Sequence, residues 1–206
     1  MRAPASAGRW TTGSTEDAGT VPPVRHPFET WPPTGRRAWA WTLTVAFLAI
    51  VVTFQILGRE LDEGGLVGLQ LARSHERVGE IISAWEADGA LGYGAFSLGL
   101  DMAFPVVYGL LLSVAASAVA RRARERGASA LVTAATAVAW LGWVAGLLDL
   151  TENAFQVPYF RDPAGSIPAL VATLATAKYA CLVVAIGVTL TGWIMNRAAS
   201  PEAAPA

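Results

Sequence analysis

The sequence predicts an all-α polytopic membrane protein: a bundle of four transmembrane helices with an amphipathic helix in the first extracytoplasmic loop. Hydrophobic residues make up 53% of the 206-residue chain and charged residues only 15%, well below the roughly 25% charge of soluble proteins. Four apolar segments reach the length of about 20 residues that a helix needs to cross a bilayer core of about 30 Å. Their apolar residues do not alternate with polar ones as in the wall of a β-barrel.

The composition also excludes several functional classes. The single cysteine, Cys181, has no partner for an internal disulfide, and His26 and His75 do not complete a Cys/His zinc spacing with it. A formal net charge of −1 does not provide the broad basic field that nucleic-acid binding needs. We therefore expect no nucleic-acid partner, no metal site and no cofactor.

The chain begins and ends in segments that predict disorder. Residues 1–37, the predicted cytoplasmic tail, are rich in Pro, Gly, Ser and Thr, and residues 198–206 consist mainly of Ala and Pro. The transmembrane domain is expected between them, over residues 38–197. Its first apolar segment, 38–57, carries no charge and begins with Trp39 and Trp41, whose rings suit a membrane interface. No apolar stretch follows Met1 directly, so this segment predicts an uncleaved anchor.

The polar segment that follows predicts one amphipathic helix over about 66–88. Several of its apolar residues fall roughly on one helical face: Leu69, Ala72, Val78, Ile81, Ile82 and Trp85. We interpret this helix as a cap over the outer end of the bundle, with a gate or a partner-binding helix as the alternative. His75 is expected to be a solvated residue of the same helix.

The remaining transmembrane helices are predicted at about 92–120, 130–156 and 167–195. Four ionisable residues interrupt them: Asp101, Asp149, Glu152 and Lys178. A charge at the bilayer centre costs about 2.5–3.5 kcal/mol on insertion scales, so such residues usually face the bundle interior and pair with each other. Three acids and one base leave a surplus of negative charge, which requires protonated carboxyls, a cation or a wet cavity.

The distribution of arginines predicts the orientation, because positive residues are retained on the cytoplasmic side. Seven arginines lie on one side of the predicted membrane: Arg36, Arg37, Arg121, Arg122, Arg124, Arg126 and Arg197. The opposite side has fewer arginines and many acidic residues. Both termini are therefore expected in the cytoplasm, with the protein in the inner or plasma membrane of the cell.

The third transmembrane segment carries a stripe of polar residues. They are spaced i, i+3, i+4 and i+7, which places them on one helical face: Asp149, Glu152, Asn153 and Gln156. Below them, Gly142 and Gly146 are spaced for the close approach of another helix. We expect the stripe to face the bundle; the alternative is that it forms the solvated end of the helix.

The second transmembrane segment contains Pro105, which has no N–H and therefore leaves the carbonyl of Asp101 without its helical partner. A helix kink is expected there, and Tyr108 extends the polar face of Asp101. The candidate intramembrane polar cluster consists of Asp101, Tyr108, Asp149, Glu152, Asn153 and Lys178. It is interpreted either as a ligand site or as a structural lock in which Asp101 pairs with Lys178.

Two motifs, DMAFPVVY from Asp101 to Tyr108 and DLTEN from Asp149 to Asn153, precede the isolated Lys178. This pattern resembles small bacterial four-helix integral membrane proteins with D-x-x-F-P-x-x-Y and D-x-x-E-N signatures, over about residues 66–195. The resemblance implies the same architecture and the same polar residues. It implies no activity.

Three functions are compatible with these features. In the first, the polar cluster binds or relays a proton, a cation or a lipid headgroup, with membrane lipids as partners. In the second, the protein is a structural or assembly subunit, either as a homo-oligomer or with a membrane partner protein. In the third, it is an intramembrane lipid-modifying enzyme with a carboxyl as general acid/base. Because no nucleophile, metal or cofactor motif is found, we assign no catalytic residue and expect no enzyme.

Overall fold

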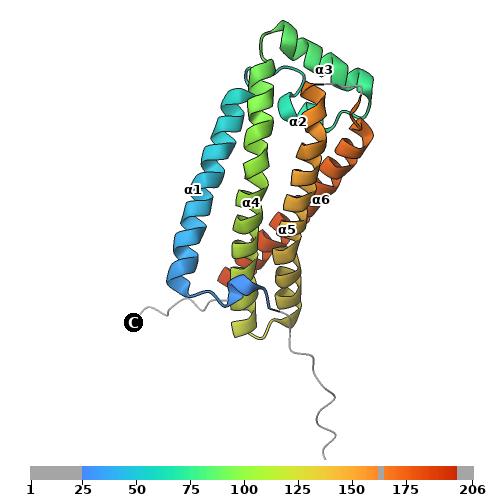
Figure 1. The fold of residues 1–206 in the computed structure, drawn as a ribbon. Coiled ribbons are helices and arrows are strands. Elements are labelled where there is room, and N and C mark those ends of the chain that lie inside the picture. The colour runs from blue at the N-terminus through green and yellow to red at the C-terminus, as the bar shows by residue number, and fades with distance from the viewer. Residues whose placement is uncertain (1–24, 162–164, 199–206) are drawn as a thin grey trace, which may run out of the picture.

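The computed structural model describes residues 25–161 and 165–198, and this part of the chain is all-helical (Figure 1). Its four long helices are α1 (Pro33–Leu57), α4 (Leu91–Glu125), α5 (Ser129–Gln156) and α6 (Pro168–Ala198). By length and composition each of them is able to cross a membrane; the third candidate span extends from α5 to Phe160. The predicted fold class is confirmed.

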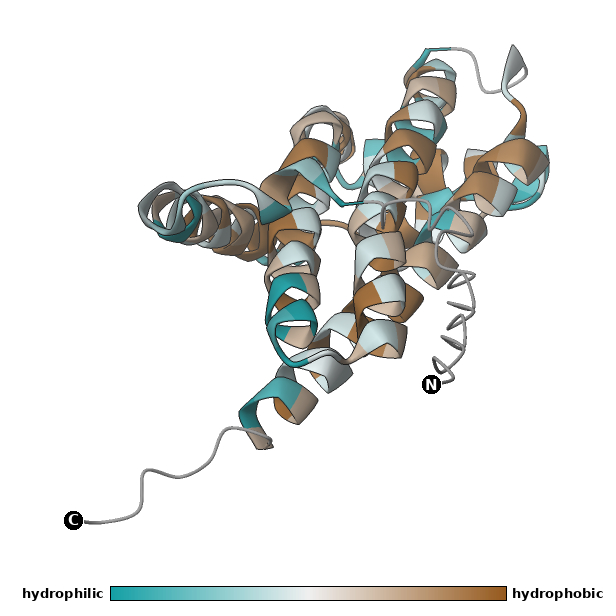
Figure 2. Ribbon diagram, turned by 90° about the horizontal axis from the view of Figure 1, so that it is seen from below, coloured by the Kyte–Doolittle hydropathy of each residue, from teal (hydrophilic) through white to brown (hydrophobic). Residues whose placement is uncertain are grey.

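Helices α4, α5 and α6 form the packed part of the bundle, and α1 lies at its side against α4 (Figure 1). Large apolar side chains of α1, such as Trp41 and Val45, are more than half exposed. Figure 2 shows apolar residues along the long helices on outward sides as well as inward ones. This is the surface expected of helices surrounded by lipid, because lipid tails are as apolar as a protein core.

Two short helices, α2 (Gly65–Gln70) and α3 (His75–Ala87), lie across one end of the bundle, which we call the cap end. The prediction of a single helix over 66–88 is therefore wrong. The chain leaves the helix after Gln70 and starts a new one at Ser74, whose side chain accepts a hydrogen bond from the Arg77 N–H. Serine is among the residues most favoured at a helix N-cap, and this local cap competes with helix continuation. His75 is exposed at the start of α3.

The apolar face predicted for this region is buried. Leu69, Val78, Ile81 and Trp85 are fully enclosed and pack in one cluster with Tyr159. The Trp85 ring lies over Gly94 of α4, where a Cβ atom would come within 2.6 Å of the ring, and the indole N–H donates to the carbonyl of Asp62 at 3.1 Å. Helix α2 thus packs against α4 and α6, and α3 packs against α4.

The described part of the predicted N-terminal tail is folded. A short 3-10 helix, η1 (Pro27–Glu29), packs the buried Phe28 against α1 and α4, and α1 begins at Pro33 instead of 38. Proline suits the first helical turn, where its missing N–H costs nothing, so Pro33, within the proline-rich segment that predicted disorder, starts a helix. Residues 1–24 of the predicted tail lie outside the described residues, as do 199–206 of the C-terminal one.

The two glycines predicted to permit close helix approach do so. A Cβ atom on Gly142 would lie 3.1 Å from the Gly109 carbonyl oxygen, and one on Gly146 would lie 3.2 Å from that of Pro105. Both contacts are with the backbone of α4, which cannot rotate away as a side chain can. The close packing of α4 and α5 therefore depends on these glycines.

Replacing Gly142 with leucine is expected to lower the free energy of unfolding in detergent micelles by about 1–3 kcal/mol, the usual cost of overpacking. The matched control is Gly187→Leu in α6, because nothing lies within 4 Å of a Cβ at that position. Thermal unfolding of the two variants measures the difference. Equal melting temperatures would contradict the close backbone contact.

Candidate functional site

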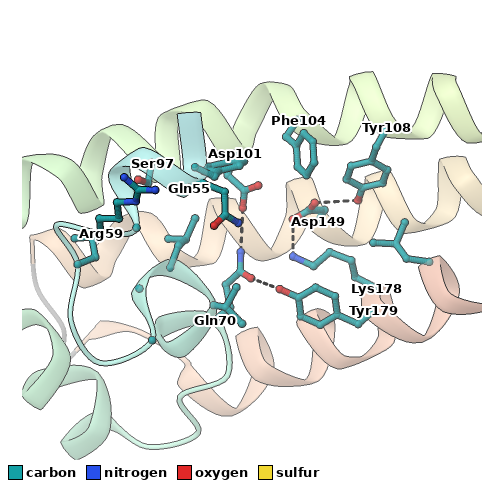
Figure 3. A pocket seen from close by; sticks show the side chains of 18 residues that line it. Gln55, Arg59, Gln70, Ser97, Asp101, Phe104, Tyr108, Asp149, Lys178 and Tyr179 are labelled. Carbon is teal, nitrogen blue, oxygen red and sulfur yellow. Dashed lines mark hydrogen bonds and ion pairs between the residues drawn. The ribbon is translucent and has the colours of Figure 1, made fainter. Parts of the chain in front are cut away.

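The structure brings the six residues of the predicted polar cluster together just below the cap. They come from α4, α5 and α6. Four of them, Asp101, Tyr108, Asp149 and Lys178, line a cavity of about 450 Å³ that also reaches α1 and α2, whereas Glu152 and Asn153 contact Lys178 and the Asp101 carbonyl. Figure 3 shows Asp101, Tyr108, Asp149 and Lys178 directed into this region from three helices. Phe54 of α1 and Leu182 of α6 contribute apolar parts of the wall.

The stripe on α5 faces the bundle, as predicted, and holds Lys178. The Nζ atom of Lys178 lies 2.8 Å from Asp149 Oδ1 and 2.7 Å from Glu152 Oε2, and all three side chains are at most 4% exposed. The Tyr108 hydroxyl donates to Asp149 Oδ2 at 2.9 Å. Gln156 donates to Glu152 Oε1 at 2.9 Å and to Asn153 Oδ1 at 3.1 Å. These groups are buried, so the stripe is not a solvated helix end.

Asp101 has different partners from those predicted for the structural lock. Its Oδ2 atom accepts a hydrogen bond from Gln70 Nε2 at 2.9 Å, and Gln70 Oε1 accepts one from the Tyr179 hydroxyl at 2.6 Å. Among the described residues, no salt bridge reaches Asp101, because Lys178 is engaged by the two acids of α5. The ion pairs of Lys178 therefore join α6 to α5, and Asp101 lines the cavity without a salt bridge to Lys178.

The expected consequence of Pro105 is present in α4. Asn153 Nδ2 donates to the carbonyl oxygen of Asp101 at 2.9 Å, which is the carbonyl that the missing N–H of Pro105 leaves without a helical donor. A buried carbonyl without a donor would cost about 1–3 kcal/mol, so Asn153 makes the proline compatible with the bundle. The predicted bend of α4 stays a prediction.

Sequence reasoning missed Gln70 and Tyr179. Gln70 lies at the end of the short helix α2. Its burial depends on the interruption of the helix between Gln70 and His75, which the prediction of one continuous helix did not include. Tyr179 adjoins Lys178 in sequence, and a tyrosine in an apolar segment is also typical of a membrane interface. The contact between Gln70 and Asp101 could not be predicted from the sequence, because it depends on where α2 lies in the fold.

A second buried polar group lies at the opposite end of the bundle, where the sequence predicted a disordered tail. His26 Nδ1 lies 3.1 Å from Ser117 Oγ, and its ring contacts Trp140 with centroids 4.6 Å apart. Glu29 Oε1 accepts a hydrogen bond from the backbone N–H of His26 at 3.0 Å, and Glu29 Oε2 lies 3.2 Å from the Arg124 guanidinium. These contacts dock η1 onto α4 and α5.

The docking of η1 is expected to weaken at acidic pH. Burial lowers the pKa of His26 below its ordinary value of 6.5, partly opposed by Glu29. Because the folded-state pKa is the lower one, the stabilisation is present above pH 6.5 and is lost as the pH falls through the folded-state pKa. Amide hydrogen exchange at residues 25–31, corrected for intrinsic rates, should therefore accelerate from pH 7 to pH 5.

Two variants control this measurement. His26→Gln should remove the pH dependence, whereas His75→Gln, at an exposed position of α3, should keep it. A wild-type exchange rate that does not change with pH after the correction would contradict the role of His26.

The described part of the chain contains no group of three or more His, Cys, Asp or Glu side chains placed to hold a metal ion. Comparison of the chain with protein-family models, with curated proteins and with solved structures gave no match. The resemblance to four-helix membrane proteins with the two signatures therefore stays a prediction.

Proposed function

We propose that this multi-pass membrane protein binds the polar headgroup of a membrane amphiphile in the cavity below the cap. The observation that carries this proposal is that charged and apolar side chains line one space: Asp101, Asp149 and Lys178 together with Phe54 of α1 and Leu182 of α6. The volume of about 450 Å³ falls within the range of about 300–1,000 Å³ typical of small-molecule sites.

The arrangement of α1 supports a route from the bilayer. Among the long helices α1 packs mainly against α4, so the cavity wall between Phe54 on α1 and Leu182 on α6 is not closed by tight packing of these two helices. An amphiphile would enter through this side with its headgroup toward Asp101 and keep its acyl chains in the membrane. The positive-inside rule supports an orientation with the cap end outside the cell and both termini in the cytoplasm.

The packing of the lower bundle favours binding over conduction of protons or cations. Beyond Tyr108, α4 and α5 meet backbone to backbone at Gly109 and Gly142, and the Ser113 hydroxyl donates to the Ala139 carbonyl at 2.6 Å. These contacts pack α4 directly against α5 at that level. The assembly-subunit and lipid-modifying alternatives have no comparable observation in the described residues.

Filling the cavity tests the proposal. Leu182→Trp places a large ring in the space, whereas Val183→Trp, at the next position and 71% exposed, points a ring toward lipid. Both variants are purified in mild detergent, and bound lipid is measured by native mass spectrometry. We expect Leu182→Trp to lower lipid occupancy about tenfold, a free-energy loss of about 1.4 kcal/mol, and Val183→Trp to leave it unchanged. Equal occupancy in both variants would refute the proposed site.

A further inference from the structure

The buried charges in and next to the cavity do not balance. Lys178 forms ion pairs with both Asp149 and Glu152, and Asp101 receives a neutral amide hydrogen bond from Gln70 at 2.9 Å. Asp101 is only 5% exposed, and a positive partner would offset the loss of hydration of its ionised carboxylate. The described side chains do not supply that partner in a salt bridge. A ligand cation next to Asp101 would supply it.

Three aromatic rings line the same cavity as Asp101. Phe104 contacts Phe54 and Tyr108, with ring centroids 5.5 Å and 5.2 Å apart, and all three residues line the space. Aromatic faces attract cations through their quadrupole. The acid and the rings therefore favour the same kind of group, an ammonium.

A positive side chain lies at the rim. Arg59 follows directly after the end of α1 at Leu57 and Gly58, lines the cavity and is exposed. Figure 3 shows its guanidinium on the same side of the cavity as Ser97 and Asp101. The planar guanidinium fork fits phosphate oxygens, which it binds through two parallel N–H···O bonds. The rim is thus suited to a phosphate and the interior to an ammonium.

We infer, on the basis of the binding function proposed above, that the preferred ligand is a zwitterionic phospholipid headgroup, with its ammonium at Asp101 and its phosphate at Arg59. An anionic headgroup of similar size would satisfy Arg59 but leave Asp101 without a cation. The site therefore selects phosphoethanolamine-type headgroups over phosphoglycerol.

Binding of two lipids with identical acyl chains tests this assignment. Delipidated protein in detergent is titrated with phosphatidylethanolamine and with phosphatidylglycerol, and both affinities are read by native mass spectrometry. We expect a preference of about tenfold or more for phosphatidylethanolamine, equal to at least about 1.4 kcal/mol. Asp101→Asn should abolish the preference by weakening phosphatidylethanolamine binding, and Arg59→Gln should weaken the binding of both lipids.

Matched controls are available on the cap. Asp88→Asn and Arg73→Gln make the same chemical changes at exposed positions that do not line the cavity, and they should leave both affinities unchanged. If Asp101→Asn does not give a monodisperse protein, the wild-type preference and the Arg59→Gln variant still decide the result.

The failure of this inference differs from the failure of the proposed function. Equal affinities for the two lipids in the wild type would overturn the headgroup assignment and leave lipid binding intact. No binding of either lipid would overturn both. Water-soluble glycerophosphoethanolamine is added as a competitor: competition as strong as that of the intact lipid would support the headgroup assignment and refute the membrane source of the ligand.

Discussion

Replacing Lys178 with methionine is expected to destabilise the protein by about 3–5 kcal/mol, the usual effect of removing one partner from a buried ion pair. The loss is large because one ammonium serves two carboxylates, at 2.8 Å and 2.7 Å. Without it, Asp149 and Glu152 face each other in an enclosed part of the bundle. Reversible unfolding in detergent, followed by tryptophan fluorescence, measures the effect.

A triple variant separates the charge effect from the loss of packing. Lys178→Met combined with Asp149→Asn and Glu152→Gln removes all three charges while it keeps the shapes of the side chains, so most of the stability should return. A matched control is Arg37→Met, which removes an exposed cation at the other end of the bundle. If Lys178→Met alone were as stable as Arg37→Met, the proposed lock between α5 and α6 would be refuted.

Replacing Trp85 with alanine should have the second large effect, about 3–5 kcal/mol, as for other fully buried tryptophans. Its side chain is fully enclosed among α2, α3 and α4, and its indole N–H bond to Asp62 would also be lost. The cap would separate from α4 and release Gln70 from Asp101. Faster hydrogen exchange in α2 and α3, together with a lower melting temperature, would report this opening.

Trp41→Ala is the corresponding control, because Trp41 is 72% exposed on α1 and contributes no packing to the cap. It should leave exchange in α2 and α3 unchanged. If Trp85→Ala also left this exchange unchanged, the cap would not depend on the tryptophan.

The four long helices follow from the sequence because a bilayer sets their length and forbids unpaired backbone groups. The end of α4 was predicted less well. It continues past 120 to Glu125, where Arg122 and Arg124 occupy its last turn and interact favourably with the negative end of the helix dipole. The predicted segment ends at 120 because the apolar run stops before Arg121, whereas the helix continues through the charged residues to Glu125.

The polar cluster was predictable to the extent that helical spacing determines it. Residues of the α5 stripe share a face whatever the tertiary structure, and Pro105 identifies the carbonyl that Asn153 binds. The partner of Lys178 was not predictable, because it depends on how far α4, α5 and α6 are rotated toward each other. In the observed arrangement Lys178 pairs with the acids of α5, and Asp101 accepts a hydrogen bond from Gln70 instead.

An experimental structure of the protein in a lipid bilayer tests the central claim most directly. We predict lipid density in the cavity below the cap, with the phosphate at Arg59, the headgroup nitrogen at Asp101, and acyl chains leaving between α1 and α6. Lys178 should remain bound to Asp149 and Glu152. A cavity that contains only water, or one closed by contact of α1 with α6, would contradict the account.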